Sequence, residues 1–231
     1  MPPVPAPISA ADVLQRHDAL LASPGWPNAG LAADESAPPS AAGGELWRWV
    51  QRNHRFNSLL WAEEDLARRT TVAAADIATN KRAIDGYNQA RNDATERVDE
   101  ILLLALGLVD ADSARTDAPV ARVPAAARLN SETAGSMIDR LSILALKVHA
   151  MRAQTLRSDV DSAHRSASIT KLERLQHQRH DLAGCLDALL ADAGAGHAYF
   201  KVYRQFKMYN DPSMNPELVK EQQARAVGVA P

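Results

Sequence analysis

The thirteen prolines of the chain are distributed very unevenly, and their distribution strongly constrains the fold. None lies between Ser40 and Ala118, and none lies between Ala125 and Asp211. Because a proline inside a helix costs about 3 kcal/mol or more, these two stretches permit long helices. The segments that contain proline are expected to be tails and loops: 1–7, 24–39, 119–124 and 212–231.

Apolar residues in the proline-free stretches recur with the period of a helix, and no alternation typical of strands lasts more than a few positions. The pattern predicts an all-α fold, a bundle of about four long antiparallel helices plus shorter terminal helices. Long helices are expected at about 45–69, 73–106, 131–159 and 161–192, and shorter ones at 9–22 and 198–208. The predicted parts are a helix with a Pro/Ala/Gly-rich loop (1–44), the helical bundle domain (45–211) and a mobile C-terminal tail (212–231).

Local signals predict where several helices begin and end. Ser9 is expected to cap the first helix, and Gly107 to end the helix at 73–106. Thr70 and Thr71 are expected to break the chain between the first two long helices and to cap the second. Asn130 or Ser131 is expected to cap the helix at 131–159.

The composition excludes several classes of protein. Lys and Arg number 26 and Asp and Glu 28, and this balance argues against a nucleic-acid partner or a polybasic membrane binder. A single cysteine, Cys185, excludes an internal disulfide framework. The longest apolar run, Ile101 to Val109, is shorter than the ~20 residues of a transmembrane helix. With no signal-peptide pattern at the N-terminus, the sequence predicts a cytoplasmic protein without a transmembrane segment.

Polar residues form a stripe along each of the first two long helices. The first stripe consists of His54, Asn57, Trp61, Glu64 and Arg68, and the second of Lys81, Asp85, Asn88, Asn92, Glu96 and Asp99. Spacings of three and four place each set on one helix face, and a short connection favours antiparallel neighbours whose stripes face each other. Since asparagine is a poor helix former, the three asparagines indicate tertiary hydrogen bonds or a ligand.

Two arginines, Arg91 and Arg179, occupy positions within apolar stripes and therefore need partners, because an unpaired buried charge costs several kcal/mol. The helix at 131–159 adds further charged residues around its apolar ridge: Asp139, Arg140 and Lys147. A last polar cluster precedes Pro212 and contains Lys207, Asn210 and Asp211.

Four segments resemble the motifs of an uncharacterised bacterial family, the domain of unknown function numbered 4254. They span 53–69, 81–99, 131–147 and 207–212 and occur in the same order as in the family. Where the family motif S-E-T-P-G has proline, this chain has Ala134, a difference that affects only a helix start. The resemblance implies a genomic setting, because family members tend to be encoded among genes for lipopolysaccharide and other surface-glycan synthesis, near glycosyltransferases. It implies no reaction.

These residues suggest a site that binds or acts on a phosphorylated sugar or a nucleotide sugar. The expected phosphate ligands are Arg68, Lys81, Arg91, Arg140 and Lys147, and the residues expected to bind hydroxyl groups are Asn57, Asn88 and Asn92. The catalytic candidates, as Mg²⁺ ligands or a general base, are Glu64, Asp65, Glu96 and Asp99.

Other interpretations stay open at this point. The spacing of Glu96 and Asp99 is similar to that in helical nucleoside-triphosphate pyrophosphohydrolases, but the paired first motif is missing around Glu63 to Asp65. A non-enzymatic scaffold or adaptor for glycosyltransferases would use the polar stripes as a structural network. Ala-rich helix faces also allow a homo-oligomer. A ligand site predicts a cavity with unpaired donors and acceptors, whereas a structural network predicts that all of them are paired.

Overall fold

The computed structural model describes residues 4–28, 43–205 and 211–226. These residues form an all-α fold, as the proline distribution and the helical period predicted. Its helices are α1 (Ala10–Leu21), α3 (Gly44–Ala67), α4 (Ala74–Ala105), α5 (Ala134–Thr155), α6 (Ser162–Gly194) and α7 (Pro216–Ala226). Two short strands, β1 (Arg128–Leu129) and β2 (Ala198–Tyr199), pair in parallel.

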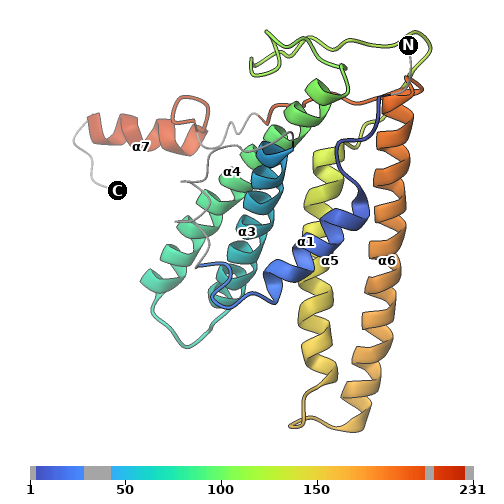
Figure 1. Ribbon diagram of the computed structural model, residues 1–231. Coiled ribbons are helices and arrows are strands. Elements are labelled where there is room, and N and C mark those ends of the chain that lie inside the picture. The colour runs from blue at the N-terminus through green and yellow to red at the C-terminus, as the bar shows by residue number, and fades with distance from the viewer. Residues whose placement is uncertain (1–3, 29–42, 206–210, 227–231) are drawn as a thin grey trace.

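The four long helices form two antiparallel hairpins, α3 with α4 and α5 with α6 (Figure 1). Helix α5 contacts α3 and α4 as well as α6 and therefore joins the hairpins. Helix α1 crosses the bundle obliquely and packs on α3, α5 and α6, whereas α7 projects from it (Figure 1). Each long helix contributes fully buried side chains to one core, including Val50, Leu102, Leu141 and Leu186. Burying such a side chain stabilises the fold by roughly 1.5–3 kcal/mol.

The buried arginine of α6 has the partner that its position required. Arg179 is 8% exposed, and its Nη2 lies 2.9 Å from Oδ1 of Asp18 on α1. The same nitrogen donates a hydrogen bond of 3.2 Å to the carbonyl oxygen of Leu14. Arg179 thereby links α6 to α1. These contacts explain why a cation can occupy a position within the apolar stripe.

Two of the predicted helix signals are confirmed. The Ser9 hydroxyl accepts a hydrogen bond of 3.2 Å from the backbone N–H of Asp12 and caps α1. Gly107 closely follows the end of α4 with a φ of +69°, a left-handed conformation in which glycine has no steric penalty. The site where the family motif has proline, Ala134, is the first residue of α5, so the difference falls at a helix start.

Three predictions about local structure are wrong. Thr133 caps α5 in place of Asn130 or Ser131, because its hydroxyl accepts a hydrogen bond of 3.1 Å from the Ser136 N–H, while Asn130 donates its backbone N–H to Tyr199 in the strand pairing. Ala73 precedes α4 and makes no side-chain cap, so Thr70 and Thr71 break the chain without capping the helix. The expected helix at 198–208 is strand β2 and extended chain through residue 205, and its last residues lie outside the described ranges.

The segment expected to be a mobile tail contains helix α7. Pro216 is its first residue, a position where the missing N–H of proline costs nothing, and Asn215 Oδ1 accepts a hydrogen bond of 3.0 Å from the Glu217 N–H. No residue of α7 is buried. This agrees with the small number of apolar side chains that its sequence could bury.

Candidate functional site

A cavity of about 370 Å³ lies among α3, α4 and α5. It is called the polar cavity below and is lined by Asn57, Leu60, Trp61, Glu64, Asp65, Arg68, Asn88, Arg91, Ile143 and Leu146. Seven of these residues were predicted from the sequence: Asn57, Trp61, Glu64, Asp65, Arg68, Asn88 and Arg91. The spacings of three and four along α3 and of three along α4 place them on facing helix surfaces. The first stripe and the middle of the second thus converge.

Asp139 of α5 links the inner end of this cavity to the two other helices. Its Oδ1 accepts hydrogen bonds of 2.8 Å from the side-chain nitrogens of both Asn53 and Asn57. Its Oδ2 lies 3.9 Å from Nη1 of Arg91. Among the described residues, the two N–H groups of Asn57 Nδ2 are shared between acceptors on Asp139, Asn53 and Ser142. The Asn57 carbonyl oxygen is therefore the group that can accept a hydrogen bond from a ligand.

Arg91 retains unused capacity for hydrogen bonding. Its Nη2 donates to the Oδ1 of Asn92 at 3.0 Å, and its contact with Asp139 is at the outer limit of an ion pair. Its Nε is buried and has no hydrogen-bond partner in the described part of the chain. A buried unpaired donor is costly, particularly on a cation. At the wall of a cavity, such a guanidinium is well suited to bind an anion.

The opposite wall of the polar cavity is exposed and easily rearranged. Arg68 and Glu64 form an ion pair of 2.9 Å, with side chains that are 68% and 46% exposed. An exposed pair of this kind contributes about 0–1 kcal/mol, so a ligand can replace one partner at small cost. Trp61 is 37% exposed and presents an aromatic surface beside them. For Asn88, no side-chain hydrogen bond is found among the residues the structure describes.

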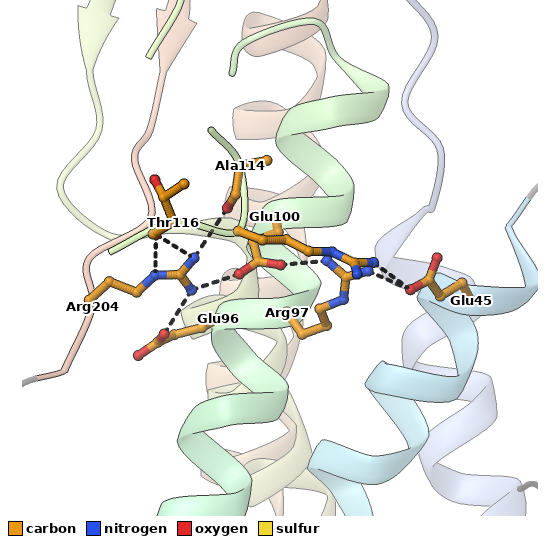
Figure 2. A network of polar contacts seen from close by, with 8 residues as sticks. Glu45, Glu96, Arg97, Glu100, Ala114, Thr116 and Arg204 are labelled. Atoms are coloured by element: carbon orange, nitrogen blue, oxygen red, sulfur yellow. Dashed lines mark hydrogen bonds and ion pairs between the residues drawn. The ribbon is translucent and has the colours of Figure 1, made fainter. Parts of the chain in front are cut away.

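The carboxylate of Glu96 belongs to a different site, an ion cluster beside the extended segment at 200–205 (Figure 2). Glu96 Oε2 lies 3.0 Å from Nη1 of Arg204, and Glu96 Oε1 accepts a hydrogen bond of 3.0 Å from the Gln205 N–H. Asn92 donates a hydrogen bond of 2.7 Å to the side chain of Gln205. These residues hold the segment after β2 against α4, and their polar groups are used within the protein.

Asp99 is a buried structural carboxyl group, and the residue is 4% exposed. Its Oδ1 accepts a hydrogen bond of 2.6 Å from the Gly135 N–H at the start of α5. Burial raises the pKa of Asp99 to about 7, because the charged form loses its hydration. Among the catalytic candidates, only Glu64 and Asp65 line the polar cavity.

The remaining candidates are distributed over the surface. Lys81 pairs with Asp85 on α4, and Arg140 pairs with Glu132. The Ser213 hydroxyl and N–H bind Asp211 and hold the pKa of its carboxyl group below the usual value. Lys147 lines a second cavity, described below. Lys207 and Asn210 lie outside the described residues.

His54 is enclosed between other rings and does not line the polar cavity. Its ring stacks on His17 with centroids 4.3 Å apart and on Trp26 with centroids 5.5 Å apart, and its Nδ1 lies 2.8 Å from the Ser142 hydroxyl. Burial lowers the pKa of His54 to about 3 and lowers the pKa of His17 well below its usual value. Both rings are neutral at pH 7.

These histidines should make the protein sensitive to mild acid. Below pH 6.5 both histidines become protonated in the unfolded chain but stay neutral in the folded protein. Each histidine therefore lowers the free energy of unfolding by about 1.4 kcal/mol for each unit by which the pH falls. Asp99 has the opposite effect on the free energy of unfolding between pH 7 and the ordinary pKa of an aspartate. In that range its carboxyl group is protonated in the folded protein and ionised in the unfolded chain. Urea unfolding should show a net loss of about 1.4 kcal/mol per pH unit between pH 6 and 5.

His17→Phe is the matched variant for this acid sensitivity. Phenylalanine keeps a ring against His54, and neither nitrogen of His17 has a hydrogen-bond partner in the described residues. In this variant the effect of His54 on the free energy of unfolding is opposed by the effect of Asp99. The free energy of unfolding should therefore hardly change between pH 6 and 5. An unchanged slope in this variant would show that the stacked histidines do not cause the sensitivity.

No group of three or more His, Cys, Asp or Glu side chains in residues 4–28, 43–205 and 211–226 is arranged to hold a metal ion. Glu64 and Asp65 line the polar cavity, whereas Glu96 and Asp99 bond to Arg204 and Gly135. The four carboxylates predicted as Mg²⁺ ligands therefore do not form one site. No described helix is long and apolar enough to cross a membrane.

Comparison with known proteins identifies a family. No curated protein and no solved structure matches the chain. A family model described as "Protein of unknown function (DUF4254)" matches residues 47–202, which contain most of α3, all of α4 to α6, both strands and every residue of the polar cavity. Since this match spans more than half of the chain, the protein belongs to the DUF4254 family.

Proposed function

We propose that the polar cavity binds a phosphorylated sugar or a nucleotide sugar. The observation that carries the proposal is the unpaired buried Nε of Arg91 at a cavity that also presents an aromatic ring and amide groups. At about 370 Å³ the cavity falls within the usual range for small-molecule sites. The setting among surface-glycan genes that the family resemblance implies supports this ligand class.

Each wall of the polar cavity has a role in this proposal. Arg91 donates to a phosphate oxygen from the inner end, and Arg68 supplies a second positive charge at the exposed end. The Trp61 ring packs against the face of a sugar or a base. The Asn57 carbonyl and the Asn88 amide bind hydroxyl groups, and Glu64 and Asp65 are the carboxylates placed to act on a bound substrate.

A scaffold for glycosyltransferases is the second candidate, and a specific observation favours it. Part of the α4 stripe is satisfied internally, because Asn92 bonds to Gln205, Glu96 to Arg204 and Asp99 to Gly135. A polar network of this kind fixes the register of a bundle without any ligand. The polar cavity distinguishes the two candidates, since a scaffold does not require its unpaired groups.

The test is an affinity measurement by calorimetry with UDP-glucose, GDP-mannose and glucose 1-phosphate, each with and without Mg²⁺. Arg91→Met should weaken binding of the ligand by at least tenfold, because a charge-assisted hydrogen bond contributes about 1.5–3 kcal/mol. Arg82→Met is the matched control, since Arg82 is exposed on the same helix and its Nη2 donates a hydrogen bond to Thr79, one turn away on that helix. No binding across the panel, or equal losses in both variants, would contradict the proposal.

A further inference from the structure

A second cavity, of about 430 Å³, adjoins the polar cavity and is called the apolar cavity below. It lies among α3, α5 and α6 and is lined by Trp61, Lys147, Ala150, Met151, Gln154, Lys171, Arg174, Leu175 and Gln178. Trp61 lines both cavities, so its indole stands where they meet. The two spaces therefore share a wall and are not independent sites.

One face of α5 runs through both cavities. Ile143 and Leu146 line the polar cavity, and Lys147, Ala150, Met151 and Gln154 continue the same face into the apolar cavity. The spacings of three, one, three, one and three residues keep all six on a single surface of the helix. A ligand lying along α5 can contact both sets, passing Trp61 on the way.

The charge around the apolar cavity is of one sign. Lys147, Lys171 and Arg174 are exposed, and none has a hydrogen bond or an ion pair to any described residue. No carboxylate of the described residues lines this cavity, although acidic residues outnumber basic ones in the chain, 28 to 26. The walls between the cations are Met151, Leu175 and the hydrocarbon stems of the long side chains. Three unpaired cations around an apolar surface complement an anion that carries a hydrocarbon chain.

We propose that the ligand of this protein is an anionic amphiphile, a phosphorylated sugar carrying a hydrocarbon chain, with the chain in the apolar cavity. The inference rests on the proposed function, since the head group occupies the polar cavity beside Arg91. Burial of the chain would supply affinity that the phosphate and hydroxyl contacts alone do not, because each buried methylene group leaves water for an apolar surface.

The first test compares dodecyl phosphate with butyl phosphate by calorimetry, below the concentration at which dodecyl phosphate forms micelles. The full-length protein should bind dodecyl phosphate at least tenfold more tightly. Ala150→Phe places a ring in the apolar cavity and should remove this difference while leaving UDP-glucose binding unchanged. Ala167→Phe is the matched control, because Ala167 is an exposed residue of α6 that does not line the cavity.

A charge variant tests the cationic rim separately. Lys171→Glu combined with Arg174→Glu should weaken dodecyl phosphate binding at least tenfold and leave dodecyl maltoside, an uncharged amphiphile, unaffected. Both residues are exposed, so the double variant should fold normally.

Equal affinities for the two alkyl phosphates, with UDP-glucose still bound, would overturn this inference and leave the proposed function standing. Tight dodecyl phosphate binding that Arg91→Met does not weaken, with no nucleotide sugar or sugar phosphate bound, would instead overturn the proposed function. Saturation by an acidic amphipathic peptide where dodecyl phosphate fails would show that a protein helix occupies the groove, which also overturns the inference.

Discussion

Gly135→Ala is expected to lower the free energy of unfolding by about 3 kcal/mol, because α5 begins in direct contact with α4. A Cβ at this position would lie 2.6 Å from the Thr95 carbonyl oxygen and 2.8 Å from Oδ1 of Asp99. The first of these atoms is backbone and cannot rotate away. The Gly135 N–H also donates to Asp99, so moving α5 outward would weaken that hydrogen bond.

Two other glycines serve as controls for this substitution. Gly86 of α4 and Gly184 of α6 both lie inside helices. Apart from the adjoining chain and helix backbone, no described atom lies within 4 Å of the position that a Cβ would occupy on either residue. Changing either to alanine should raise the free energy of unfolding by about 0.5–1 kcal/mol, through helix propensity alone. Urea unfolding of the three variants measures the contrast. A Gly135→Ala protein as stable as the Gly86→Ala protein would contradict the close approach of the two helices.

Arg204→Ala is expected to lower the free energy of unfolding by about 3–4 kcal/mol, because the arginine joins three parts of the chain (Figure 2). Its Nη1 lies 2.6 Å from Oε1 of Glu100 and 3.0 Å from Oε2 of Glu96. Its Nη2 donates hydrogen bonds of 3.1 and 3.0 Å to the carbonyl oxygens of Ala114 and Thr116. Glu100 is 5% exposed, so removing the arginine leaves a buried carboxylate whose other ion-pair partner among the described residues is Arg97.

The control for the ion cluster is Arg225→Ala on α7. Arg225 pairs with Glu221, but its side chain is 73% exposed, and the loss should stay below about 0.5 kcal/mol. A double-mutant cycle with Arg204→Ala and Glu100→Gln should show a coupling of about 1–3 kcal/mol. Additive effects would show that Arg204 does not stabilise the fold through Glu100.

The helical architecture could be predicted from the sequence because it depends on local signals. Proline-free stretches and the period of apolar residues identify the four long helices, and the spacing along α3 identifies the residues that line the polar cavity. Ser9 and Gly107 act through hydrogen bonds or conformations of the nearby backbone, so both could be recognised. These features need no knowledge of distant parts of the chain.

The features that were missed depend on partners far away in the sequence. Asparagine is a residue type that often caps helices, but the Asn130 N–H donates a hydrogen bond to the backbone of Tyr199. Tyr199 lies in a strand that no local sequence pattern predicts. Glu96 belongs to the same stripe as Asn88, yet Arg204 neutralises it from a segment more than a hundred residues away. Asn53 was missed, although it lies four residues before Asn57 and shares Asp139 with it. That spacing was the available signal.

Whether Arg91 binds a phosphate group in the polar cavity can be read from the NMR signal of its Nε–H group. Since this nitrogen has no partner among the described residues, its N–H resonance should shift when UDP-glucose or glucose 1-phosphate saturates the protein. The signal is assigned by its absence in Arg91→Met, and the Arg82 Nε–H serves as the unaffected reference. An Arg91 signal that stays unchanged at saturation, or a protein that saturates with neither ligand, would contradict phosphate binding by Arg91.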